Sequence, residues 1–175
     1  MKPTILMVTL SIALASLSGC DGPPADGPPT VMLGDSVCDQ CNMIISDERW
    51  ATATIIEGPR GPEARLFDDF NCQVNFEVEN PDSSILSRWS HSHATREWVR
   101  TENARFLMSP NLRTPMGSHI AAFASGGEAD EAKAELTGDV VTFDIAWKRL
   151  GFAGACCHAE GSEIQDAEQE QPDGP

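Results

Sequence analysis

The sequence predicts an α+β fold made of two small ββα-type units. Short runs rich in threonine, isoleucine, valine and alanine are typical of strands, and twice such runs are followed by a segment with helical spacing of apolar residues. Two rounds of strands and then a helix are the pattern of an α+β fold. We expect the folded body to cover residues 31–155.

Each element has a local signal in the sequence. In chain order we expect strands at residues 50–57 and 64–67, a helix at 70–78, strands at 98–101, 105–108 and 118–124, a helix at 128–136, a strand at 140–143 and a short closing helix at 144–150. Phe70, Val74 and Val78 indicate one apolar face of the first helix. Asp68 or Asp69 can cap that helix.

The first 19 residues have the order of a secretory signal. Lys2 precedes an apolar stretch that is shorter than the ~20 residues a membrane-spanning helix needs. The stretch ends in Leu17-Ser18-Gly19-Cys20, which resembles the lipobox of bacterial lipoproteins. We therefore expect cleavage before Cys20 and a diacylglycerol anchor, with palmitate among its acyl chains, on the Cys20 thiol.

This anchor predicts a location on the periplasmic side of a bacterial membrane. Asp21 resembles the signal that retains such lipoproteins at the inner membrane. Residues 20–30 contain four prolines and form a spacer after the lipidated cysteine. Residues 156–175 hold a Cys-Cys-His junction and an acidic tail that lacks the apolar side chains needed to fold. The net charge of −15 argues against nucleic-acid binding.

The spacing of the cysteines indicates a functional site. Cys38-Asp-Gln-Cys41-Asn-Met43 is a C-x-x-C motif, which serves as a zinc knuckle, a redox dithiol or a metal-transfer site. The thioether of Met43 favours the last of these, because thiolate and thioether are soft ligands that suit copper(I). Alternatively, Met43 fills the core beside its apolar neighbours.

Another soft donor lies far along the chain. Met116 is in a turn bounded by proline and glycine, so its side chain need not be buried. We expect it to face Met43 across the fold as a further copper ligand. His119 is a candidate nitrogen ligand, although a single histidine at the start of a strand is also commonly a half-exposed polar residue.

These motifs together resemble the NosL family, lipoproteins that assist copper-centre assembly in nitrous-oxide reductase. The resemblance covers residues 37–150 and rests on Cys38-x-x-Cys41-x-Met43, Phe67-Asp68-Asp69, Thr114-Pro115-Met116-Gly117, Ala122-Phe123-Ala124 and Thr142-Phe143-Asp144. It implies ββα-type units akin to organomercurial lyase and a copper(I) site on Cys41 and Met43, with Met116 as a third donor. The chain departs from the family at Asn42, where glycine is common, and at His119, where a small residue is common.

Three further groups are weaker candidates. His91 and His93 would share a face if their segment were a strand, but their polar surroundings favour a solvated loop. Cys156-Cys157-His158 could bind metal or form an intermolecular disulfide. Cys72, beside the apolar face of the first helix, is expected to be a buried, unreactive thiol.

The sequence therefore predicts a copper(I) chaperone rather than an enzyme. The resemblance implies that its partners are the apo-protein of nitrous-oxide reductase and the associated copper-delivery machinery. A periplasmic thiol-disulfide oxidoreductase using Cys38 and Cys41 is the main alternative. A lyase for carbon–metal bonds, using paired thiols and an acid such as Asp68 or Asp69, and a passive copper buffer are further alternatives.

Overall fold

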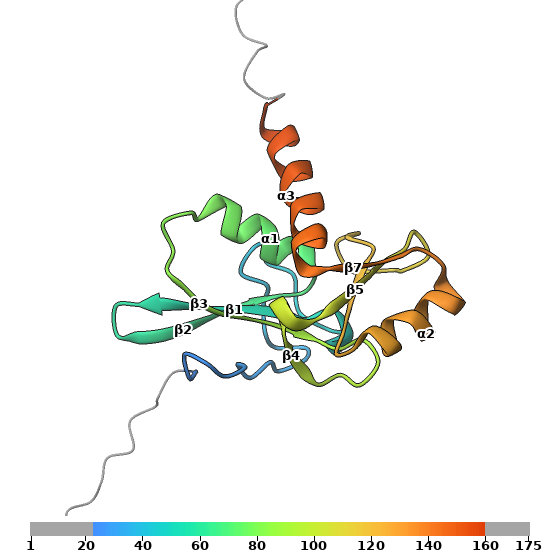
Figure 1. Ribbon diagram of the computed structural model, residues 1–175. Helices are drawn as coiled ribbons and strands as arrows, with labels where there is room; N and C mark the ends of the chain where they lie inside the picture. Colours follow the sequence, from blue (N-terminus) through green and yellow to red (C-terminus); the bar gives the residue numbers. More distant parts are fainter. Residues whose placement is uncertain (1–22, 160–175) are drawn as a thin grey trace, which may run out of the picture.

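The computed structural model describes residues 23–159, with side chains described as far as residue 151. The signal segment, Cys20 and the acidic tail lie outside this range, as do the side chains of Cys156-Cys157-His158. Two antiparallel sheets and three α-helices make up the described part (Figure 1), which confirms the α+β class. Within residues 23–159, no helix has both the length and the apolar character needed to cross a bilayer.

The first sheet has the strand order β2-β1-β3-β4. Its strands are β1 (Thr52–Gly58), β2 (Gly61–Phe67), β3 (Ile85–His91) and β4 (Trp98–Arg100). The expected hairpin is β1 and β2, which pair from Thr52 with Phe67 to Gly58 with Gly61. Gly61 has a φ of +122°, which only glycine adopts with ease, so the turn depends on this residue.

Strand β3 corrects two expectations. Residues 90–93 are not a solvated loop, because β3 ends at His91 and the side chains of Ser90, His91 and Ser92 are buried. Their polarity is accommodated inside the protein: Ser90 Oγ lies 2.9 Å from Thr101 Oγ1, and the His91 ring stacks on Trp98. Strand β4, expected in the second unit, pairs with β3 and so belongs to the first sheet.

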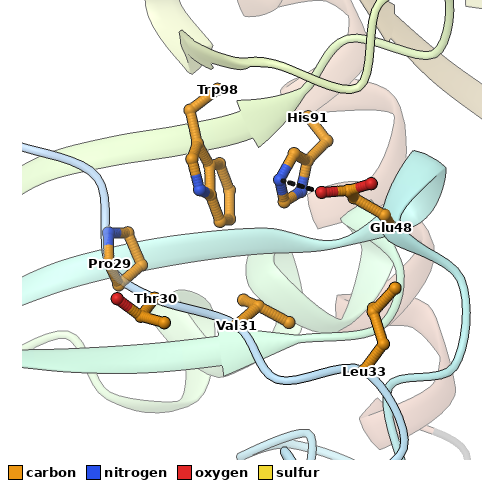
Figure 2. Close-up of a pocket in the computed structure, with 7 residues that line it drawn as sticks. All are labelled: Pro29, Thr30, Val31, Leu33, Glu48, His91 and Trp98. Atoms are coloured by element: carbon orange, nitrogen blue, oxygen red, sulfur yellow. Dashed lines mark ion pairs between the residues drawn. The ribbon is translucent and has the colours of Figure 1, made fainter.

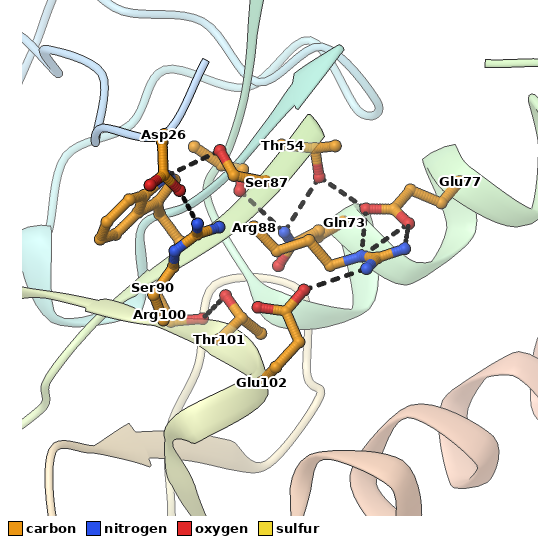
Figure 3. A network of polar contacts seen from close by, with 12 residues as sticks. Asp26, Thr54, Gln73, Glu77, Ser87, Arg88, Ser90, Arg100, Thr101 and Glu102 are labelled. Atoms are coloured by element: carbon orange, nitrogen blue, oxygen red, sulfur yellow. Dashed lines mark hydrogen bonds and ion pairs between the residues drawn. The ribbon is translucent and has the colours of Figure 1, made fainter. Parts of the chain in front are cut away.

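Helix α1 (Phe70–Glu79) is fixed to the first sheet by buried polar contacts (Figure 3). Gln73 Nε2 donates a hydrogen bond to the Ala53 carbonyl (2.9 Å) and Thr54 Oγ1 donates one to Glu77 Oε1 (2.6 Å). The Arg88 guanidinium of β3 pairs with Glu77 at 2.7 Å. Val78 is exposed, contrary to expectation, because in the last turn of α1 it is Glu77 that is buried against the sheet.

The second sheet has the order β6-β5-β7 and carries two helices. The elements are β5 (Arg105–Met108), β6 (Ile120–Phe123), α2 (Gly126–Leu136), β7 (Asp139–Thr142) and α3 (Phe143–Ala159). Two 3-10 turns, η1 (Glu48–Trp50) and η2 (Thr101–Asn103), complete the described elements. Helix α3 is longer than the expected helix 144–150 and projects from the body (Figure 1).

Three apolar clusters form the core. One lies between α1, α3 and the second sheet around Phe106, and another lies under α2 around Phe123. The third is smaller and contains Cys38, Phe67 and Cys72 together with Ile45 and Ala51. This third cluster brings the N-terminal segment against the end of β2 and the start of α1, which is where the candidate site forms.

Candidate metal centre

The Cys38–Met43 segment is a closed loop held by its own backbone. The Cys38 amide donates to the Met43 carbonyl (2.8 Å), and the Asn42 amide donates to the Cys38 carbonyl (3.0 Å). Asn42 has a φ of +61° and His119 has a φ of +57°, the left-handed region that glycine adopts most readily. The two departures from the family pattern thus occupy positions whose backbone favours glycine, and Asn and His are among the non-glycine residues enriched there.

Asp39 fastens this loop to the end of strand β2. Its amide donates to the Leu66 carbonyl (2.8 Å), and its Oδ2 accepts a hydrogen bond from the Leu66 amide (2.7 Å). Since β2 ends at Phe67, the next residue, Asp68, is placed directly beside the cysteine loop. The sequence between β2 and α1 therefore supplies one wall of the site.

Four side chains from three segments meet at this point. The sulfurs of Cys38, Cys41 and Cys72 and a carboxylate oxygen of Asp68 all lie within 4.8 Å of one another. Cys38, Asp68 and Cys72 are buried, whereas Cys41 is partly exposed. Cys41 Sγ also donates a hydrogen bond to Asp68 Oδ1 at 3.4 Å. We call these four residues the thiol cluster, in which Cys41 is the member that solvent reaches.

Hydrogen bonding within the thiol cluster separates the thiol pKa values. The pKa of Cys38 is lowered to about 6, chiefly because the Cys72 thiol donates to it, with backbone amides of the loop helping. The pKa of Cys41 is raised to about 11, mainly by burial and further by its contact with Cys38. The pKa of Cys72 is raised by the same hydrogen bond to Cys38 and by burial. These hydrogen bonds therefore favour the thiolate form of Cys38, below the surface, over that of Cys41 or Cys72.

Met116 is held close to the thiol cluster through the start of helix α1. Asp69 occupies the expected N-cap position of α1, but its carboxylate makes no cap bond. Instead, Asp69 Oδ2 accepts hydrogen bonds from the amides of Met116 (2.9 Å) and Ser118 (3.3 Å). Asn71 Nδ2 donates to the Met116 carbonyl (3.0 Å). Because Asp68 contacts Cys41 and Asp69 contacts Met116, adjacent residues link the two expected ligands.

Both expected thioether ligands lie at the surface. The side chain of Met43 is 57% exposed and that of Met116 is 43% exposed, so neither serves as a core filler. Met43 follows Cys41 by two residues on the outer side of the loop. The structure thus places soft sulfur donors both inside the protein and on its surface.

His119 is in a different environment from the thiol cluster. Its Nδ1 lies 2.7 Å from the Leu112 carbonyl, which accepts the ring N–H. The residue lines a hollow of about 300 Å³ together with Arg149 and Asp139, and it is not a member of the thiol cluster. The structure therefore brings together Cys38 and Cys41 among the expected ligands, but does not bring His119 to them.

The two other histidines whose side chains the structure describes, His91 and His93, pack against aromatic rings. His93 lies 5.0 Å from Trp50 and 5.6 Å from Phe123 between ring centroids. His91 Nε2 lies 3.7 Å from Glu48 Oε1 in a hollow of about 270 Å³ (Figure 2). The hollow is lined by Pro29, Thr30, Val31, Leu33, Glu48, His91 and Trp98. Among the described residues, the thiol cluster alone gathers three or more His, Cys, Asp or Glu donors for a metal.

Cys72 was not expected as a member of the site, whereas Asp68 was expected as a helix cap or as the acid of a lyase. Cys72 was predicted to be a buried thiol, which is confirmed, but its contact with Cys38 was not predicted. The available signal is the four-residue spacing of Asp68 and Cys72 across a helix start, which can put two side chains on one side of the chain. Such a spacing is common in sequences. It indicates a site only once the structure shows the cysteine loop packed against Asp68 and Cys72.

Comparisons with known protein families and with solved structures both point to the NosL family. The model of the NosL family matches residues 29–148, a range that contains the thiol cluster, Met43 and Met116. The fold is similar to the crystal structure of the copper chaperone NosL from Shewanella denitrificans, with a TM-score of 0.56 and 15% sequence identity over 70% of this chain and 96% of that chain. A search of curated proteins returned no match.

Proposed function

The chain belongs to the NosL family, and from this premise we propose that it is a copper(I) chaperone anchored by lipid on Cys20 at the periplasmic side of a bacterial membrane. In this proposal it delivers copper for assembly of the copper centres of nitrous-oxide reductase, with the reductase apo-protein and its copper-delivery machinery as partners. The protein carries an ion and converts no substrate, as befits a chaperone family.

The observation that carries this proposal is the arrangement of soft donors. Three cysteine sulfurs lie together, one of them partly exposed, and the side chains of Met43 and Met116 are exposed at the surface. Thiolate and thioether ligands select copper(I) over hard cations. We propose that Cys41 and Met43 are the ligands that copper meets first. The buried Cys38 and the exposed Met116 are the further proposed ligands. His119 is left out, because it is not among the residues that gather at the thiol cluster.

This arrangement suits transfer by ligand exchange. Copper(I) is stable with two or three soft ligands, so a ligand of the acceptor can bind before one of the chaperone's ligands leaves. Exposed thioethers need no deprotonation, whereas the Cys41 thiol, whose pKa is about 11, must lose its proton when it binds the metal. Loading is therefore coupled to proton release, and no free copper ion is formed during transfer.

The electrostatics of the thiol cluster argue against the thiol oxidoreductase alternative. A redox-active cysteine combines a low pKa with access to its substrate. Here Cys38, whose pKa is lowered by its hydrogen bonds, is fully buried, and Cys41 is only partly exposed, with a pKa raised mainly by burial. The thiol that solvent reaches is thus poorly suited to attack a disulfide.

The contact between Cys41 and Asp68 supports a second candidate, the cleavage of carbon–metal bonds. In that chemistry two thiolates bind the metal of an organometal and a neighbouring acid protonates the departing carbon. Incubation with methylmercury and measurement of methane tests this candidate directly. Methane release that depends on Asp68 would favour a lyase, whereas tight binding without release fits the chaperone.

An anaerobic copper(I) titration in competition with a chromophoric chelator tests the chaperone proposal. We expect the native chain to bind copper(I) tightly and the Cys41→Ser variant to lose about tenfold or more in affinity, since Cys41 joins the buried and exposed donors. His119→Gln is the matched control and should bind like the native chain. Equal affinity of the native and Cys41→Ser proteins, or preferential zinc binding by the native chain, would contradict the proposal.

A further inference from the structure

The sulfur donors of this protein are arranged at two depths. Cys38 and Cys72 are buried at 0% and 3% exposure, and both belong to the apolar cluster around Phe67. Met43 and Met116 are at the surface. Cys41 is partly exposed and lies within 4.8 Å of both buried sulfurs. Among the cysteines of the cluster, Cys41 is therefore the one that can bind copper together with the buried sulfurs or at the surface.

We propose that copper(I) rests at an interior position on the sulfurs of Cys38, Cys41 and Cys72, and that Cys41 passes it to the exposed thioethers for delivery. This inference rests on the proposed function and deepens it. It adds Cys72 as a metal ligand and divides the site into a holding position and a transfer position that share Cys41.

The distances support a shared ion in the interior. A bond between a metal such as zinc and a cysteine sulfur is about 2.3 Å long, so three sulfurs arranged trigonally around one ion lie about 4.0 Å apart. The donor atoms of the thiol cluster are within 4.8 Å of one another before any metal is bound. A contraction of less than about 1 Å therefore places all three sulfurs on one ion.

The surroundings of the thiol cluster favour a cation. Asp68 is buried beside three thiols, and among residues 23–151 no lysine, arginine or histidine forms an ion pair with it. Acidic groups buried without a compensating positive charge are costly. A bound metal ion would offset that cost, and the apolar side chains around Cys38 and Cys72 would keep water from it.

The backbone keeps the interior sulfurs in place while the outer donors can move. Cys72 lies in the first turn of α1, where its amide bonds to the Asp69 carbonyl (3.1 Å), and Cys38 is held by the Met43 carbonyl (2.8 Å). The methionine side chains have three rotatable bonds, and about half of each is exposed to solvent. Copper can move outward when a thioether binds it and a bond to Cys38 or Cys72 breaks, so the coordination number and the oxidation state stay the same.

X-ray absorption at the copper edge tests the interior position directly. Native chain and a Met43→Leu/Met116→Leu double variant are loaded anaerobically with less than one equivalent of copper(I). We expect three sulfur neighbours in both proteins, because the holding position uses cysteines only. The double variant should keep its affinity within a few fold but should release copper to the chelator about tenfold or more slowly. Met32→Leu, which changes another exposed methionine, is the control and should release copper at the native rate.

Cys72→Ser supplies the opposite test. Serine keeps the size and the hydrogen-bond donor of the thiol, and circular dichroism checks that the variant is folded. We expect its affinity to fall about tenfold or more, with fewer sulfur neighbours. Native affinity and an unchanged sulfur count in folded Cys72→Ser, or a loss of the third sulfur in the methionine double variant, would overturn the inference and leave the proposed chaperone function intact. Failure of the native chain to bind copper(I) would contradict both this inference and the proposed chaperone function.

Discussion

At the scale of single residues, His91 makes the stability of the fold depend on pH. Its ring is buried and stacked on Trp98 at 3.6 Å between centroids, and burial lowers its pKa below the ordinary value, despite the nearby Glu48. The unfolded chain therefore binds a proton at His91 more readily than the folded chain does. We expect the free energy of unfolding to fall as the pH drops below about 6.5, the value for an unperturbed histidine.

Chemical denaturation at a series of pH values between about 5 and 8 measures this effect. His91→Phe keeps an aromatic ring against Trp98 and removes the titrating group, so its unfolding free energy should fall less in this range. The pH dependence of the unfolding free energy that remains in His91→Phe includes a contribution from His93, whose pKa is also lowered by burial. The same pH dependence in native and His91→Phe proteins would show that His91 is not the source.

The residue-level signal is clearest where it is local. The Cys38–Met43 segment is recognisable from its soft donors at short spacing, and Cys38 and Cys41 do lie together in the thiol cluster. Cys72 gives no such signal, because its proximity to Cys38 depends on how α1 packs against the loop. A contact of this kind belongs to the tertiary structure and is not visible in either segment alone.

At the scale of elements, the position of helix α1 depends on one buried ion pair. Glu77 is almost fully buried and accepts hydrogen bonds from Arg88 Nε and Nη2 and from Thr54 Oγ1 (Figure 3). The guanidinium also lies 5.1 Å above the ring of Trp147 in α3. Arg88→Met leaves the Glu77 charge buried with its hydrogen bond from Thr54 but with no positive charge beside it, and we expect it to lower the free energy of unfolding by about 3 kcal/mol.

Urea denaturation compares this variant with a matched control. Arg65 also pairs with two carboxylates, those of Glu63 and Asp39, but these pairs lie at the surface. Arg65→Met should therefore cost only about 0–1 kcal/mol. Adding Glu77→Gln to Arg88→Met should restore part of the loss, because the uncompensated charge is removed. If the two arginine variants were equally stable, α1 would not depend on the buried pair.

The elements were predicted best where pattern and turn chemistry agree. The first hairpin, α1 and α2 follow from β-branched runs, a Gly-Pro turn and helical spacing. Strand β3 was missed because its sequence, Ile-Leu-Ser-Arg-Trp-Ser-His, has no clear alternation of polar and apolar residues. Ser90 and His91 are buried with hydrogen-bond or ring partners that come from other elements. Local patterning cannot anticipate such partners.

At the scale of the whole molecule, the sequence predicts two units but not how the strands are shared between them. The order β2-β1-β3-β4 takes β3 and β4 into the first sheet, so that this sheet is larger than a ββα unit. Sheet partners are set by long-range pairing, which leaves little trace in the sequence. The result places the thiol cluster where the N-terminal loop, β2 and α1 converge, near the end of the chain that is expected to carry the lipid.

The expected lipid anchor on Cys20 determines where in the cell the whole molecule is located. Several acyl chains on Cys20 would hold the protein firmly at a membrane, since each buried methylene contributes about 0.8 kcal/mol. We expect Cys20→Ser to move the protein from the membrane fraction to the soluble periplasmic fraction and to abolish incorporation of a labelled fatty acid. Cys41→Ser, which changes a thiol of the metal site instead, should stay in the membrane fraction and keep its label. Membrane retention of Cys20→Ser would mean that another segment anchors the chain.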